Sequence, residues 1–258
     1  MSQPSRRALP ALFVGHGSPM NAIEDNAFTR AWRDVADAIG KPRAIVCVSA
    51  HWTTRGTLVS GAAHPETIHD FYGFPQPLFD VRYPAPGNPV LAQRIAESVR
   101  GVRIDPTQGL DHGAWSVLRI MYPDADVPTL QLSLDMTLPG DAHYKLGRDL
   151  AFLRDEGVLI VGSGNIVHNL RLFDFHNRTP ADWAVRADAL VLDKIAAGDH
   201  EPLTRWHDLG ADVARAVPTP EHYLPLLYVL GAKRDGDAVR VFNDTVQSAI
   251  SMTSVLIG

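Results

Sequence analysis

Three histidines of this 258-residue chain follow short apolar runs, and imidazole can bind a metal ion or transfer a proton near neutral pH. They are His16 in Val-Gly-His-Gly, His51 in Ser-Ala-His-Trp and His168 in Asn-Ile-Val-His. If the runs are parallel strands, these side chains lie at the carboxyl ends of the strands, where open α/β sheets bind their ligands. Neighbouring glycines let the backbone approach closely. The pattern therefore predicts that three histidines converge on one point.

Two more histidines stand in loop or helix-start contexts, His112 in Leu-Asp-His-Gly and His222 in Pro-Glu-His-Tyr. Imidazoles without thiolates suit zinc, iron, copper or nickel, whereas structural zinc sites usually recruit cysteine and close all four positions. The chain has a single cysteine, Cys47, so a thiol-free cluster indicates a catalytic metal site with open positions. The alternative is that each histidine is an isolated surface or hydrogen-bonded group.

The other histidines carry weaker expectations. Those among charged, helical or loop residues are expected to be solvated, namely His143, His176, His200 and His207. His64 and His69 lie beside or within an aperiodic stretch, residues 65–89, that is rich in proline, glycine and aromatic residues. At that length an ordered functional loop is expected, and these two histidines could line a pocket.

Apolar runs that alternate with helical periodicity must position these side chains. Strands are expected at 8–14, 43–50, 57–60, 102–105, 127–134, 158–162, 239–242 and 250–256. Helices are expected at 25–39, 88–99, 114–121, 140–156, 180–197, 203–216 and 220–230. Alternating strands and helices predict an α/β fold with a central, mostly parallel sheet flanked by helices. No shift in composition divides the chain, so residues 1–258 are expected to form a single catalytic domain.

Composition excludes several classes of protein. Hydrophobic residues make up 45% and charged residues 21%, as in ordinary globular proteins, and the net charge of −5 leaves no basic footprint for nucleic acid. No apolar run approaches the ~20 residues that a membrane span needs. Cys47 lies in an apolar run and is expected to be a buried thiol, and the lack of disulfides suits the cytoplasm. Arg6 and Arg7 precede an apolar stretch that Pro10 interrupts, so an export signal is not expected.

Six segments that run in order along nearly the whole chain carry a resemblance to a known family. They are 14–20 (VGHGSPM), 49–52 (SAHW), 68–74 (IHDFYGF), 109–115 (GLDHGAW), 162–169 (GSGNIVHN) and 220–225 (PEHYLP). With them the sequence resembles the class III extradiol ring-cleavage dioxygenases of the LigB superfamily, in particular the 4,5-DOPA dioxygenase branch. The resemblance implies a LigB-like fold and an oxidoreductase that opens a catechol with O2 to a muconic semialdehyde. It also implies a non-haem metal, Fe(II) for turnover, with Zn(II) as a possible occupant.

The resemblance further implies roles for individual residues. His16 and His51 match the first two metal ligands, and the third position falls at Glu221-His222, where the wider superfamily has a carboxylate and this branch a histidine. Neighbours on a helix point about 100° apart, so only one of the two should face the metal. His222 is favoured, and Glu221 then supports it or caps the helix.

Two histidines match groups that move protons. His168 matches the acid–base histidine of the superfamily, yet it could instead complete a four-histidine metal site, so both roles stay open. His112 matches a second acid–base histidine. The loop Phe71-Tyr-Gly-Phe74 could form a wall for the ring or pack on itself, and Arg82 or His69 could meet a substrate carboxylate.

The residues alone leave three functions open. The same histidines could serve an extradiol dioxygenase, a zinc-dependent hydrolase that activates water, or a metal-binding module without turnover. The last predicts a closed site without a pocket. Gly162-Ser-Gly-Asn lacks the third glycine of a dinucleotide fingerprint, so no nucleotide cofactor is expected. The resemblance favours the dioxygenase, with a small-molecule catechol and O2 as its partners, and the sequence does not predict an oligomeric state.

Overall fold

An eight-stranded sheet forms the centre of the molecule. The computed structural model describes residues 8–258, so Arg6 and Arg7 lie outside the described residues. Across the sheet the strands are β4 (Arg103–Asp105), β3 (Leu58–Ser60), β5 (Thr129–Asp135), β2 (Ala44–Thr54), β6 (Val158–Gly164), β1 (Ala11–Gly15), β10 (Ser254–Ile257) and β7 (Val239–Phe242). The four central strands β5, β2, β6 and β1 are mutually parallel. β10 and β7 add antiparallel strands at one side, and β3 pairs antiparallel with β5. The prediction of an α/β fold with a mostly parallel sheet is confirmed.

The central strands form because their residues are apolar on both faces, as in a sheet that is covered on both sides. β6 is buried along its whole length, and β2 is buried from Ala44 to Ala50. Cys47 in β2 is a buried free thiol, as expected. Two hydrophobic clusters result, one on each face of the sheet.

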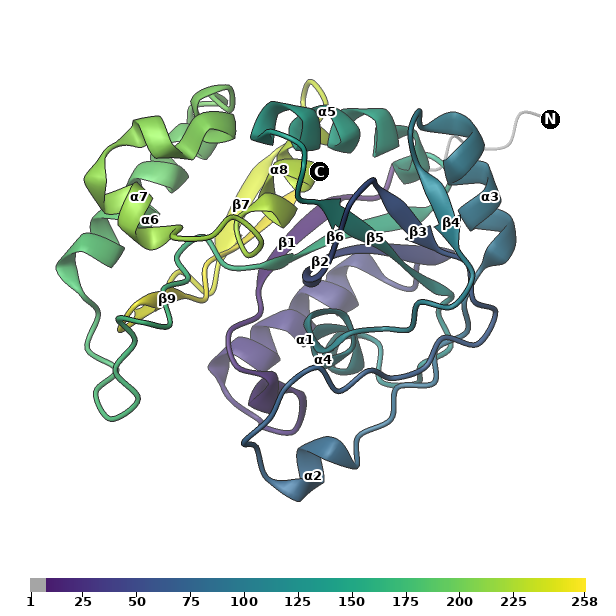
Figure 1. The fold of residues 1–258 in the computed structure, drawn as a ribbon, viewed down its shortest axis with the longest axis horizontal. Coiled ribbons are helices and arrows are strands. Elements are labelled where there is room, and N and C mark those ends of the chain that lie inside the picture. The colour runs from purple at the N-terminus through teal and green to yellow at the C-terminus, as the bar shows by residue number, and fades with distance from the viewer. Residues whose placement is uncertain (1–7) are drawn as a thin grey trace.

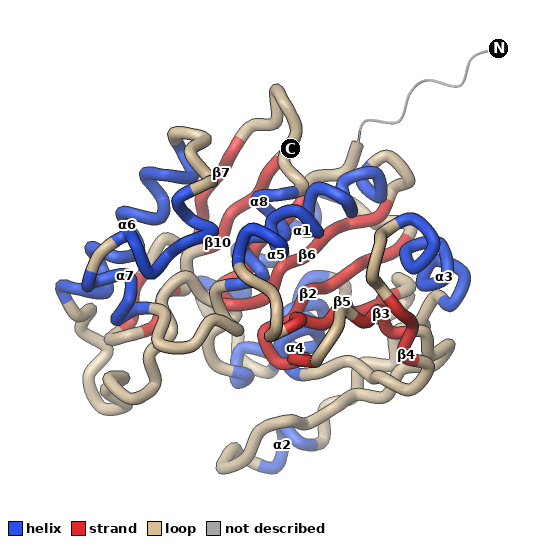
Figure 2. The backbone as a smooth tube through the Cα atoms, turned by 45° about the horizontal axis from the view of Figure 1, so that its top comes forward, coloured by secondary structure: helices blue, strands red, loops and turns tan. Residues whose placement is uncertain are grey.

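Helices cover both faces of the sheet (Figure 1). They are α1 (Ala27–Ile39), α2 (Gln76–Phe79), α3 (Pro89–Ser98), α4 (His112–Met121), α5 (Gly140–Leu150), α6 (Asp182–Ala196), α7 (Ala211–Ala216) and α8 (Leu224–Gly231). α1 and α4 pack on one face, and α5 and α8 pack on the other. In Figure 2 the single turn α2 lies out in the long loop, away from the sheet. Across residues 8–258, no helix has the length and apolar character needed to span a membrane.

Several expected elements differ from the structure. The helix expected at 140–156 ends at Leu150 and is followed by a 3-10 segment (Ala151–Arg154). The helix expected at 203–216 is divided at Gly210, whose φ of +106° stops a helix, into a 3-10 segment (Pro202–Leu209) and α7. The helix expected at 220–230 begins only at Leu224, where Pro225 suits the first turn because it has no N–H to donate. The strand expected at 250–256 is two strands, β9 (Ile250–Ser251), which pairs with β8 (Val246–Gln247), and β10.

His143 and His200 are buried, so the expectation that they are solvated is wrong, whereas His176 and His207 are exposed. His143 lies on the inner face of α5, and its Nδ1 is 3.0 Å from the hydroxyl of Tyr228. Burial lowers the pKa of His143 to about 4. A neutral imidazole is therefore part of the core.

This burial predicts a loss of stability in mild acid. The unfolded chain binds a proton at His143 near pH 6.5 and the folded chain does not, so stability falls as pH drops from about 6.5 toward the lowered pKa. The expected contribution is about 2 kcal/mol at pH 5. Urea unfolding of the wild type and of His143→Gln between pH 7.5 and 5 measures it. His207→Gln is the exposed control, and equal pH slopes for wild type and His143→Gln would contradict the argument.

Arg154 is a buried cation that ties three segments together. Its side chain is 1% exposed, and its Nη1 donates to Asp237 Oδ2 at 2.6 Å and to the carbonyl of Ala232 at 2.7 Å. Its Nε donates to the carbonyl of Leu9 at 2.6 Å. The guanidinium thus joins the approach to β1 to the connection between α8 and β7.

Replacing this arginine should be strongly destabilising. Arg154→Met leaves Asp237 and two carbonyls without their partner, so the free energy of unfolding should fall by about 3–5 kcal/mol. Thermal and denaturant unfolding would measure this. Arg186→Met, which breaks an exposed ion pair with Asp212, is the matched control and should change little. A similar effect in both variants would refute the argument.

Candidate metal centre

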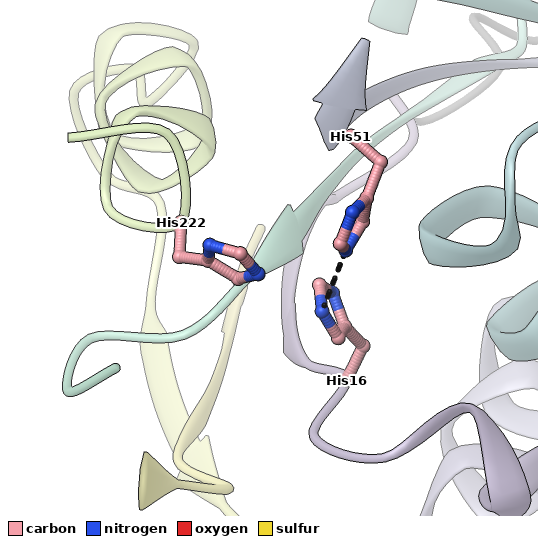
Figure 3. Close-up of side chains that lie close together, drawn as sticks. All are labelled: His16, His51 and His222. Atoms are coloured by element: carbon pink, nitrogen blue, oxygen red, sulfur yellow. Dashed lines mark hydrogen bonds between the residues drawn. The ribbon is translucent and has the colours of Figure 1, made fainter. Parts of the chain in front are cut away.

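His16, His51 and His222 converge from three separate segments (Figure 3). The Nε2 atoms of His16 and His51 are 3.3 Å apart, and the ring of His222 lies 5.3 Å from the first and 5.0 Å from the second. Each residue offers a ring nitrogen, and these three nitrogens lie within 4.8 Å of one another. One metal ion could contact all three. The strand-end pattern predicted that His168 would join His16 and His51, but His222 does so instead, and His168 groups with Glu221 and His222.

The end of β6 holds two of these segments in place. The backbone N–H of His16 donates to the carbonyl of Gly164 at 3.0 Å, and the backbone N–H of Asn165 donates to the carbonyl of His222 at 2.8 Å. A Cβ on Gly164 would lie 2.1 Å from that same carbonyl oxygen, so only glycine allows the approach.

Hydrogen bonds fix which nitrogen of His16 faces the cluster. Ser163 Oγ donates its only proton to the carbonyl of Gly113 at 2.6 Å, so toward His16 it can act only as an acceptor. His16 Nδ1, 3.0 Å away, must therefore carry the ring proton. Its Nε2 keeps a free lone pair aimed at His51 and His222. Orientation by an outer hydrogen bond is typical of metal-ligating histidine.

His51 lies inside β2 rather than after it, where the pairing of β2 with β5 is irregular between Val48 and Thr53. Such an irregularity redirects side chains and is frequent beside active sites. On the far side of the ring, Asp70 Oδ2 is 3.6 Å from Nδ1. That carboxylate favours a proton on Nδ1 and leaves Nε2 free for the cluster.

The ring of His222 faces the cluster, and the carboxylate of Glu221 lies beside the Nδ1 atom of that ring. The two residues lie in the turn before α8, not on a helix, so the helical argument for choosing between them does not apply. Glu221 Oε1 accepts from Thr219 Oγ1 at 2.8 Å and lies 3.4 Å from His222 Nδ1. The geometry thus favours His222 as the ligand with Glu221 supporting it.

His168 lies flat against His222, with ring centroids 3.5 Å apart and planes inclined by only 8°. The lone pair of an imidazole nitrogen lies in the ring plane. Two parallel planes that are stacked in this way share no point, so this arrangement does not direct both rings at one metal ion. Burial lowers the pKa of His168 to about 4, which leaves a neutral base.

His112 is the first residue of α4, and Asp70 holds it from two sides. Asp70 Oδ1 accepts the backbone N–H of His112 at 2.9 Å, and Oδ2 lies 2.9 Å from its Nδ1 without the alignment of a hydrogen bond. Burial opposes ionisation of Asp70, but His112 holds the pKa of that carboxyl below its usual value. The ring of His112 is 3.8 Å from that of His51, so it lies beside the cluster.

The three imidazoles of the cluster are neutral near pH 7, which favours binding of a metal cation over protonation. Burial, followed by repulsion from neighbouring imidazoles, lowers the pKa of His16 and of His222 well below the usual value and that of His51 to about 3. Neutral imidazoles with lone pairs directed inward are the state that binds a divalent metal. The donor set therefore fits a transition metal.

A cavity of about 900 Å³ opens onto the cluster, and all five histidines discussed above line it. This cavity does not fit the closed site that a metal-binding module without turnover would have. The aromatic lining is Phe28, Phe71, Tyr72, Phe74, Phe173 and Phe175, so the loop at 71–74 does form part of a wall. Arg82 and His69 do not line it; both are bonded to the loop itself, each to the carbonyl of Val81. Trp52 and Trp115 are buried in the core.

Two residues that orient the cluster, Asp70 and Ser163, were not predicted from the sequence. Asp70 lies in the segment Ile-His-Asp-Phe, and a carboxylate between a histidine and aromatic residues was the available signal. Ser163 offered none, because its role depends on a contact with His16, which is 147 residues away in the chain.

Comparisons with known proteins identify the family to which the chain belongs. Residues 10–254 match the family described as the catalytic LigB subunit of aromatic ring-opening dioxygenase. The chain is 47% identical to a 4,5-DOPA dioxygenase extradiol of Escherichia coli K12, over 98% of this chain and 96% of that protein. It is 38% identical to a protein of the same name from Beta vulgaris, over 92% of both chains. The crystal structure of an uncharacterized E. coli K12 protein superposes with a TM-score of 0.84 at 43% identity, over 97% of this chain and 100% of that one.

Proposed function

This chain belongs to the LigB family of aromatic ring-opening dioxygenases, and from that premise we propose that it opens a DOPA-like catechol with O2 at a metal held by His16, His51 and His222. It is an extradiol ring-cleaving dioxygenase, an oxidoreductase that incorporates both atoms of O2. The product of the reaction that we propose is a muconic semialdehyde. The convergence of three neutral imidazoles at the floor of an aromatic cavity carries the proposal. The family favours this activity over a zinc-dependent hydrolase.

We propose Fe(II) as the metal for turnover, with Zn(II) as an occupant that does not support it. Imidazole ligands suit both ions. When bound, iron would supply Lewis acidity toward the catechol oxygens and the electron path to O2 that zinc lacks. Ser163, Asp70 and Glu221 would keep the three ligand rings in the correct tautomer and orientation.

His168 and His112 are proposed to move the protons. A catechol must lose a hydroxyl proton as it binds, and a neutral histidine beside the cavity can accept it. The stacking of His168 on His222 supports an acid–base role for His168 rather than a fourth ligand role. Asp70 occupies the Nδ1 side of His112, which leaves Nε2 of that ring to exchange a proton with substrate.

The single cysteine, a buried free thiol, supports our proposal that the protein works in a reducing, cytoplasmic compartment.

Oxygen consumption tests the proposal directly. Protein loaded with Fe(II) or Zn(II) is mixed with DOPA, caffeate or 4-methylcatechol in an oxygen electrode while absorbance is followed. Stoichiometric uptake of O2 with a yellow product in the Fe(II) sample only is the expected result. No uptake with any catechol, from protein with verified metal at the histidine site, would overturn it.

A further inference from the structure

Arg178 brings a positive charge to the cavity that the ring chemistry does not use. It is exposed, so it lies toward solvent rather than among the buried histidines. Among the described residues that line the cavity it is the only lysine or arginine. Its segment follows β6 and leaves the carboxyl end of the sheet, as does the turn after β1 that carries His16 (Figure 1).

The guanidinium of Arg178 is held in place but not neutralised. Its Nη1 donates to Gln247 Oε1 at 3.1 Å, and its Cζ lies 5.2 Å from the centre of the Phe173 ring. Within residues 8–258 no acidic side chain lies within 4.0 Å of it. An arginine fixed by neutral partners keeps free donors for a planar anion such as a carboxylate.

Glu24 supplies a charge of the opposite sign from the turn after β1. It lines the same cavity and is exposed. Its Oε2 meets only the amide of Asn26, at 3.5 Å, and it forms no ion pair among residues 8–258. Its carboxylate is therefore available to an ammonium group. Asp70 also lines the cavity, but its carboxylate is beside His51 and His112, so the charges left free in the lining are one cation and one anion. The five histidines are less exposed than either of these two residues.

We propose that this outer pair selects catechols that carry an amino-acid side chain, with Arg178 binding the carboxylate and Glu24 the ammonium. The aromatic ring then lies against the phenylalanines of the cavity, and its two hydroxyls face the histidines. This inference rests on the proposed function and makes it more specific. Arg82 and His69, which the sequence offered for the carboxylate, lie outside the cavity.

Four catechols distinguish the contribution of Arg178 from that of Glu24. DOPA has both groups, 3,4-dihydroxyphenylpropionate only the carboxylate, dopamine only the ammonium, and 4-methylcatechol neither. Arg178→Gln should raise KM about ten-fold for DOPA and 3,4-dihydroxyphenylpropionate relative to dopamine and 4-methylcatechol, because a charge-assisted hydrogen bond to the carboxylate is lost. Glu24→Gln should raise KM for DOPA and dopamine relative to the other two. Arg178→Lys should recover part of the loss.

Arg171→Gln is the matched control, because Arg171 is an exposed arginine on the same loop that does not line the cavity. It removes the same charge and should leave all four KM values unchanged. A KM change in Arg178→Gln that is equal for all four catechols, or that Arg171→Gln reproduces, would overturn the proposal.

Failure of the selectivity proposal can be told from failure of the function. Cleavage of 4-methylcatechol by the wild type tests the ring chemistry without using either charge. If no catechol is cleaved, calorimetry with the metal-free protein still compares DOPA with dopamine. Tighter binding of DOPA that Arg178→Gln abolishes would support the charge pair, and equal binding of the two would refute it.

Discussion

His16→Ala is expected to lose the bound metal and at least about a thousand-fold of ring-cleavage activity. The substitution removes one of three converging lone pairs, the one that Ser163 aims at the cluster. Loss of an outer hydrogen bond alone typically costs 10- to 100-fold in metal affinity or activity, and loss of the ligand itself should cost more. Elemental analysis after Fe(II) loading gives the metal content, and oxygen uptake with DOPA gives kcat.

Two variants control this prediction. Ser163→Ala keeps the ring but loses the acceptor that fixes its tautomer, so metal affinity should fall by about 10- to 100-fold. His176→Ala removes an exposed imidazole and should retain metal and activity. Circular dichroism of each protein separates loss of metal from loss of the fold. A His16→Ala protein that is folded and still holds one iron per chain would show that the metal lies elsewhere.

The local pattern was enough to predict the middle of the sheet and the approximate place of the site. Runs such as Val158–Gly164 are apolar on both faces, as is typical of a covered parallel strand, and His16 and His168 follow the carboxyl ends of two such runs. The edges were harder to predict, because a short strand such as β9 is defined by its partner. Met252 and Thr253 separate β9 from β10, where a single strand was expected over 250–256.

Residues that act through distant contacts could not be predicted in this way. Charged neighbours made His143 look solvated, but α5 turns them outward and turns His143 toward Tyr228. Arg178 likewise gave no signal in the sequence. Its place at the cavity depends on how the loop after β6 meets Gln247. Composition and spacing report what lies on one element, whereas these roles arise where two elements meet.

His112→Ala and His168→Ala are each expected to lower kcat by about 10²- to 10⁴-fold while the protein keeps its metal. The reason is that each removes a group that exchanges a proton with the catechol but leaves His16, His51 and His222 in place. His222→Ala is the comparison, since it should lose metal and activity together. Metal content and kcat of the three variants, measured on the same Fe(II)-loaded preparations, provide the test.

The metal content of His168→Ala decides between its two possible roles. Because His168 and His222 are stacked with nearly parallel planes, only one of the pair can direct a lone pair at an ion between His16 and His51. His168→Ala should therefore bind iron as the wild type does. If it loses iron as His222→Ala does, the site has four histidine ligands and the rings must rearrange when the metal binds. If His112→Ala and His168→Ala both retain full turnover, neither histidine moves the proton, and the acid–base assignment is wrong.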